Sequence, residues 1–102
     1  MITEDQVREA LGKSDFPEGY GESFAGGLIR GLRYINPLFE NLYVTPMMTW
    51  MSWGVHDVLR YDIAEDVLYP ALERFVSALF EHDEARRAIA LQAVQEFRNI
   101  FG

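Results

Sequence analysis

The sequence predicts an all-α fold, a small single-domain bundle of four to five helices. Apolar residues recur every three or four positions along most of the chain, and glycine, proline and capping residues divide these periodic stretches. The 102 residues are 49% hydrophobic and 25% charged, as in an ordinary globular protein. A chain of this length buries a core without cross-links. We therefore expect residues 1–102 to form a single helical domain with a loop at 12–21.

The first helix is predicted to begin directly after Thr3. Thr3 and Gln6 have the spacing of a capping box, in which each side chain accepts a hydrogen bond from the other residue's backbone. Gly12 stands in the C′ position and is predicted to end this helix. The loop at 12–21 follows, because three glycines and a proline fall within it.

A second helix is predicted over 22–35, where the apolar residues share one face at a period of 3.6. Gly27 and Gly31 lie four apart and leave a shallow groove beside that face. Each costs roughly 1 kcal/mol relative to alanine in a helix, so we expect another helix or an aromatic ring to approach closely there. Pro37 is predicted to end this helix, and residues 38–44 form a short apolar connector with one or two further helical turns.

The third helix, predicted over 46–61, contains both tryptophans and three of the four methionines. Its apolar half is predicted to face the core and comprises Met47, Met48, Trp50, Met51, Gly54, Val55, Val58, Leu59 and Tyr61. Its other half is polar and comprises Thr49, Ser52, Trp53, His56, Asp57 and Arg60. Trp53 therefore lies on the side of the helix that is turned away from the core.

Two more helices are predicted, one over 63–80 and one from Asp83 onward. Apolar positions of the first stay in phase across Pro70, which leaves two alternatives: one helix kinked at Pro70, or a helix that begins near Asp66 with Pro70 in its first turn. Asp83 is predicted to cap the last helix and to pair with Arg87 one turn later.

The motifs that carry catalysis or metal binding are absent or incomplete. Residues 21–27 resemble a nucleophile elbow, but an elbow needs a preceding strand and an α/β sheet. Phe24 stands where the Gly-x-Gly-x-x-Gly phosphate motif needs glycine, and neither histidine has the glutamate three residues earlier that a di-iron bundle uses. The run 81–84 is rich in ligand types, but we expect it to cap a helix junction. We predict a protein that is not an enzyme and has no cofactor and no metal.

The net charge is −7, from 16 acidic and 9 basic residues. An acidic surface repels phosphate backbones, so direct nucleic-acid binding is disfavoured, whereas a basic protein partner would be attracted. The alternative is that the charge only maintains solubility. No apolar run approaches the roughly 20 residues of a membrane span, and the acidic first residues do not resemble a signal peptide. The absence of cysteine fits a reducing compartment, so we expect no membrane contact and a cytoplasmic location.

The polar half of the third helix is the candidate partner-binding site. Its members are Thr49, Trp53, His56, Asp57 and Arg60. Tryptophan and arginine are the residues that most often anchor protein interfaces. The alternative is that the 12–21 loop or the C-terminal helix covers Trp53, with its indole N–H hydrogen-bonded.

Three functions remain open on the sequence. The first is a non-enzymatic inhibitory protein that occludes a partner's surface; in class it resembles bacterial immunity proteins, antitoxins and phage-encoded inhibitors, which are often small and acidic. The second is a structural or adaptor homodimer that pairs through the stripe 47–59 or through the groove at Gly27 and Gly31. The third is a small-molecule binder whose apolar pocket is lined by Met48, Met51, Trp50, Tyr34 and Phe24.

Overall fold

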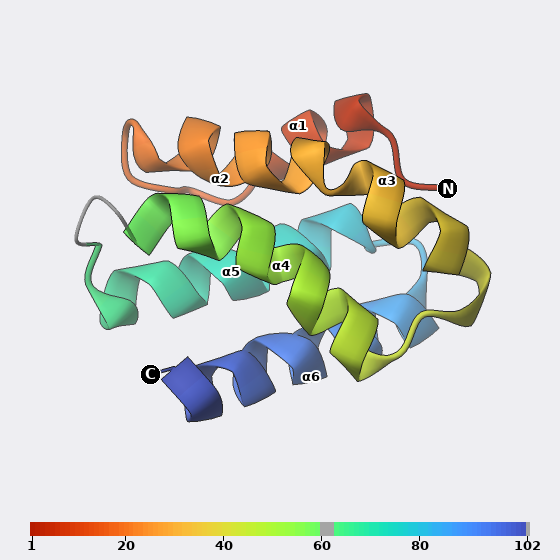
Figure 1. The fold of residues 1–102 in the computed structure, drawn as a ribbon. Coiled ribbons are helices and arrows are strands. Elements are labelled where there is room, and N and C mark those ends of the chain that lie inside the picture. The colour runs from red at the N-terminus through yellow and green to blue at the C-terminus, as the bar shows by residue number, and fades with distance from the viewer. Residues whose placement is uncertain (60–62, 102) are drawn as a thin grey trace.

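The computed structural model describes residues 1–59 and 63–101, apart from the side chains of residues 57 and 59, and all regular structure in these ranges is helical (Figure 1). The elements are α1 (Glu4–Gly12), α2 (Tyr20–Arg30), α3 (Leu32–Ile35), a 3-10 helix η1 (Asn36–Asn41), α4 (Val44–Leu59), α5 (Glu65–Leu79) and α6 (Glu84–Phe101). The all-α class is confirmed. The expected count of four to five helices is too low, because the described residues form six α-helices.

The additional helix arises at Gly31, where the single helix expected over 22–35 divides into α2 and α3. The Gly31 N–H donates to the carbonyl oxygens of both Gly27 and Leu28, so α2 ends in a tightened turn and α3 begins at once. The α-helical stretch ends at Ile35, just before Pro37, as predicted, but Pro37 does not end the helical path. It stands in the first turn of η1, where a missing N–H leaves no hydrogen bond unmade.

The first helix begins as predicted and ends with a different cap from the one expected. The Gln6 N–H donates to Thr3 Oγ1 at 3.2 Å and the Thr3 N–H donates to Gln6 Oε1 at 2.8 Å, which confirms the capping box. The helix ends at Gly12 as predicted, but the predicted C′ role of Gly12 is wrong, because Gly12 is the last helical residue and Lys13 is the C-cap. The buried Ser14 hydroxyl donates to a carbonyl oxygen of the last turn, so no left-handed glycine is needed there.

Helix α5 runs without a break from Glu65 to Leu79, with Pro70 as its sixth residue. Of the two alternatives, the helix that begins near Asp66 is the closer one, although Pro70 falls just beyond its first turn. The carbonyl oxygen of Asp66 therefore lacks the N–H partner that an ordinary residue at position 70 would supply.

The five long helices close a ring around one apolar core. Contacts run from α1 to α2, from α2 to α4, from α4 to α6, from α6 to α5 and from α5 back to α1. In Figure 1, α4 crosses the front of the molecule with α2 above it and α6 below it. The largest fully buried side chains come from five of the helices and are Trp50, Phe24, Phe75, Leu28, Ile35, Met47, Met51, Leu68, Leu72, Val7, Val55 and Val58.

Glycines set the spacing between α2 and α4. A Cβ built at Gly27 would meet the carbonyl group of Trp53 and lie 2.8 Å from the Cα of Gly54, and one built at Gly31 would lie 2.8 Å from Cδ1 of Trp50. The expected close approach is therefore confirmed in both forms, a helix backbone at Gly27 and an aromatic ring at Gly31. The groove is filled by this chain's own α4, so it is not available to a second copy of the protein.

Candidate functional site

The outer face of α4 is where the predicted binding residues lie. Thr49, Trp53 and His56 follow one another at intervals of four and three residues, and all three are exposed. The Thr49 hydroxyl donates to the carbonyl oxygen of Thr45 at 3.1 Å, one turn earlier. The Asp57 side chain and the whole of Arg60, which the sequence places on the same face, lie outside the described residues.

Trp53 has an exposed fraction of 43%. The alternative in which the 12–21 loop or the C-terminal helix covers this side chain is therefore wrong. The 12–21 loop is held against α5 by Arg74. Arg74 Nε donates to the carbonyl oxygen of Ser14 at 2.6 Å, and Arg74 Nη2 donates to the carbonyl oxygen of Asp15 at 3.1 Å. A large aromatic side chain thus stays open to solvent on a helix whose opposite face forms the centre of the core.

The backbone that carries Trp53 is held firmly. Its carbonyl group and the Cα of Gly54 lie directly against Gly27. One turn earlier, Trp50 is fully buried and its Nε1 donates to the carbonyl oxygen of Leu28 at 2.9 Å. Any rotation or sliding of α4 would disturb both contacts, so the packing of α2 against α4 sets the backbone position of Trp53.

Few of the acidic residues belong to the helix that carries Trp53. Of the 16 acidic residues, only Asp57 belongs to α4, and most of the others lie on α1, in the segment 15–22, at the start of α5 and in the turn between α5 and α6. The net charge therefore acts on an approaching molecule mainly through residues outside α4.

The apolar pocket expected among the third helix and its neighbours is not formed by these residues. Phe24, Trp50 and Met51 are buried members of the core, and Met48 is partly buried against it. The stripe proposed for a homodimer is also used within the chain, because the described apolar residues of α4 pack against α2 and α6.

A cleft of about 360 Å³ lies between α1 and the carboxyl end of α5. It is referred to below as the α1–α5 cleft. Its lining residues come from three separate parts of the chain and are Met1, Ile2, Gln6, Glu9, Ala10, Lys13, Phe39, Ala78, Leu79, Phe80, Glu81, His82 and Asp83. The sequence contains no local signal for this cleft, because it exists only when α1, η1 and α5 have packed together.

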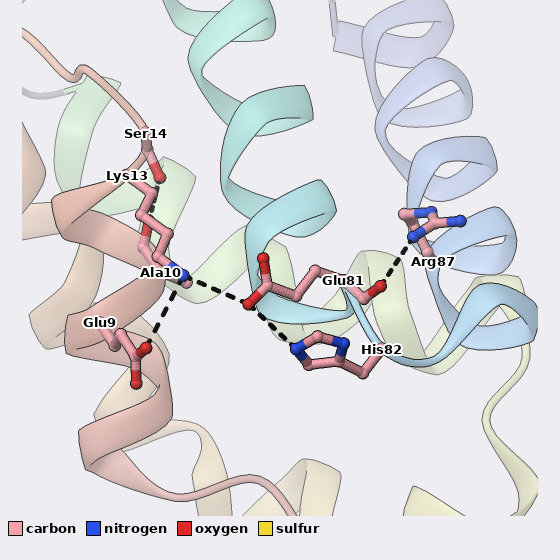
Figure 2. A network of polar contacts seen from close by, with 7 residues as sticks. All are labelled: Glu9, Ala10, Lys13, Ser14, Glu81, His82 and Arg87. Carbon is pink, nitrogen blue, oxygen red and sulfur yellow. Dashed lines mark hydrogen bonds and ion pairs between the residues drawn. The ribbon is translucent and has the colours of Figure 1, made fainter.

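Charged side chains from α1 and from the turn after α5 line the cleft, and Figure 2 shows the contacts between them. Lys13 Nζ lies 3.2 Å from Oε1 of Glu81 and 3.7 Å from Oε1 of Glu9, and His82 Nε2 lies 3.4 Å from the same Glu81 oxygen. The Glu81 carbonyl oxygen accepts a hydrogen bond from Nη1 of Arg87 at 3.1 Å. Glu81 therefore connects α1 with the turn that leads into α6.

Asp83, which also lines the cleft, is paired with Arg86. Asp83 Oδ1 accepts the Arg86 N–H at 3.1 Å, which confirms Asp83 as the cap of α6, and Asp83 Oδ2 lies 2.8 Å from Arg86 Nη1. The expected pairing with Arg87 is wrong, since Arg86 is the partner. The hydrogen bonds from the Arg86 side chain and backbone hold the pKa of Asp83 below its ordinary value. Arg86 also donates twice to the carbonyl oxygen of Phe39, and its guanidinium carbon lies 4.4 Å from the centre of that ring.

The described residues allow two further observations on the kind of site this protein has. Within residues 1–59 and 63–101, no three histidine, aspartate or glutamate side chains come close enough together to hold a metal ion. Across the same ranges, no helix combines the length and the apolar character that crossing a membrane requires.

Comparisons of the chain with protein-family models, with curated proteins and with solved structures found no match.

Proposed function

We propose that this protein is a non-catalytic binding protein that inhibits a protein partner by covering part of its surface, and that the outer face of α4 makes the contact. The observation that carries the proposal is the exposure of Trp53 on a helix whose backbone is fixed by Gly27. Tryptophan is the side chain most enriched among interface residues that dominate binding energy. A rigidly presented, exposed tryptophan is therefore the feature of this surface that best fits recognition of another protein.

The charge distribution favours a partner with a basic surface. A net charge of −7 raises the rate at which a basic protein encounters this one, and the acidic residues outside α4 supply nearly all of it. Docking then buries Trp53, with Thr49 and His56 beside it. Asp57 and Arg60 complete the face that the sequence predicts.

The partner can be identified with a photo-crosslinking side chain placed at Thr49, in the cell that makes the protein. We expect it to capture a basic protein, and the same side chain placed at Glu73 on α5 to capture none.

The affinity of the purified pair is then measured for Trp53→Ala, which we expect to weaken binding by about 30-fold or more, as loss of a dominant interface residue does. Tyr43→Ala is the matched control, because Tyr43 is an exposed aromatic residue that precedes α4. Equal affinities of the wild type and Trp53→Ala would remove the α4 face from consideration.

Self-association is the competing use of the same face. The groove first considered for a homodimer is filled by α4 of the same chain, and most of the described apolar residues of the stripe are buried, namely Met47, Trp50, Met51, Val55 and Val58. A dimer would therefore need a surface such as the one around Trp53. Sedimentation at micromolar concentration separates the two uses, because a wild-type dimer that becomes a monomer in Trp53→Ala would assign the face to a second copy of the chain.

A further inference from the structure

We propose that the α1–α5 cleft is a second, independent binding site and that it takes a small primary amine with an apolar body. The cleft lies at the junction of α1, η1 and the end of α5, and none of its lining residues belongs to α4. The inference therefore does not depend on the function proposed for Trp53.

The size of the cleft fits one small molecule. A volume of about 360 Å³ lies at the lower end of the range for pockets that enclose small ligands, which is roughly 300 to 1,000 Å³. Its apolar surface comes from both sides, with Ile2 and Ala10 on the α1 side and Leu79 and Phe80 on the α5 side. An apolar body of a few carbon atoms would lose its contact with water there.

The charged side chains that line the cleft determine which end group such a ligand carries. Glu9 and Glu81 supply two carboxylates around the one ammonium group of Lys13, and His82 Nε2 lies 3.4 Å from the Glu81 oxygen that Lys13 also contacts; with the histidine counted as neutral, these four side chains carry a net charge of −1. The Lys13 ammonium marks a point from which two carboxylates are within reach. Exposed ion pairs of this kind contribute little to stability, and the Lys13 and Glu81 side chains are 47% and 46% exposed. Lys13 is therefore able to move aside for the ammonium group of a ligand.

The third carboxylate that lines the cleft, that of Asp83, does not compete for that ammonium group. The Asp83 carboxylate is already neutralised by Arg86, whose guanidinium group lies over the Phe39 ring. The amine is thus directed to Glu9 and Glu81, with its apolar body turned toward Leu79 and Phe80. A carboxylate ligand of the same shape would meet Glu9 and Glu81 and be repelled.

The first test uses phenethylamine as the probe, with phenethyl alcohol as its neutral analogue and hydrocinnamate as its anionic analogue. Binding is followed by backbone amide shifts in proton–nitrogen NMR spectra. We expect saturable shifts with phenethylamine, concentrated at residues 2–13 and 78–83, weaker shifts with the alcohol and none with hydrocinnamate. The proposal fails if phenethylamine gives no saturable shifts there or if the anion binds as well as the amine.

Two single variants separate charge recognition from simple apolar binding. Lys13→Ala frees both carboxylates, so we expect the affinity for phenethylamine to rise about two- to fivefold, and Glu81→Gln should lower it by a similar factor. Glu65→Gln is the matched control, because it removes the same charge at the far end of α5. Unchanged affinity in both cleft variants would overturn the proposal. The side chains of Lys13, Glu81 and Glu65 are exposed, and circular dichroism checks that the variants keep their helices. Trp53→Ala should leave amine binding unchanged, because Trp53 does not line the cleft.

Discussion

Two tryptophans three residues apart on α4 have opposite surroundings. Trp50 is fully buried, and its indole N–H donates to the carbonyl oxygen of Leu28, which also accepts the Gly31 N–H. Trp53 is 43% exposed, and its main-chain carbonyl lies against Gly27 of α2. The first side chain therefore contributes to stability, whereas the second is available for contact with another molecule.

Replacing each tryptophan by phenylalanine should separate these roles. Trp50→Phe removes a buried hydrogen bond and part of a packed ring, so we expect the free energy of unfolding to fall by about 1–3 kcal/mol. Trp53→Phe should change it by less than about 0.5 kcal/mol, as exposed substitutions usually do. Urea unfolding followed by circular dichroism gives both values. A loss at Trp53 as large as the loss at Trp50 would show that the exposed ring has a structural role instead.

The sequence predicts that Trp50 faces the core and that Trp53 faces away from it. It does not predict all of the contacts that produce this difference. Helical periodicity alone places Trp50 toward the core and Trp53 away from it. The acceptor of the Trp50 N–H could not be found in the same way, because Leu28 lies 22 residues earlier and meets Trp50 only once α2 and α4 have packed. The same holds for Arg86, whose acceptor at Phe39 is 47 residues away.

The contact between α2 and α4 depends on glycine at specific positions. A side chain at Gly27 would collide with the backbone of α4, whereas the nearest atom to a Cβ at Gly26 is Arg30 Nη1 at 3.7 Å, an ordinary contact. Two neighbouring glycines in one helix therefore have different reasons for being there. Gly27 permits the helices to approach, and Gly26 has no such constraint.

Alanine substitutions at these two positions should have effects of opposite sign. Gly27→Ala forces α2 and α4 apart, and we expect it to lower the free energy of unfolding by about 1–3 kcal/mol or more. Gly26→Ala gains the better helix propensity of alanine without a collision, so it should raise the free energy of unfolding by up to about 1 kcal/mol. Thermal unfolding measured by circular dichroism compares them directly. If both variants are stabilised, the close approach of the two helices is not required for the fold.

At the scale of whole elements, local sequence predicts where helices begin better than where they divide. The start of α1 follows from its capping box and the start of α6 from Asp83, because both signals lie within four residues. The division at Gly31 was missed, since it depends on the Trp50 ring that occupies the space beside that glycine. The error at Gly12 has a similar origin, because the Ser14 hydroxyl takes over part of the capping that a left-handed glycine would otherwise provide.

At the scale of the whole molecule, a site can be predicted from the sequence when its residues lie close together in the chain. The α4 face lies within one helix, so its three described residues are brought together by helical geometry alone. The α1–α5 cleft joins residues 1–13, 39 and 78–83, and closure of the ring between α1 and α5 creates it. A site of the second kind has no signature in the sequence, because it requires the relative position of three separated segments.

The closed ring also predicts how the protein unfolds. One cluster of buried side chains includes residues from α1, α2, α4, α5 and α6, so loss of any one of these helices exposes apolar surface on its neighbours. We therefore expect a single cooperative unfolding transition, as in other small domains. Three probes test this in the Trp53→Phe variant: Trp50 fluorescence for the α2–α4 contact, the His82 imidazole NMR signal for the turn between α5 and α6, and circular dichroism for all helices. Coincident urea midpoints are expected, because the ring cannot open at one contact without weakening the next; a separate, earlier midpoint at His82 would mean that the α5–α6 end and its cleft fold as a unit apart from α2 and α4.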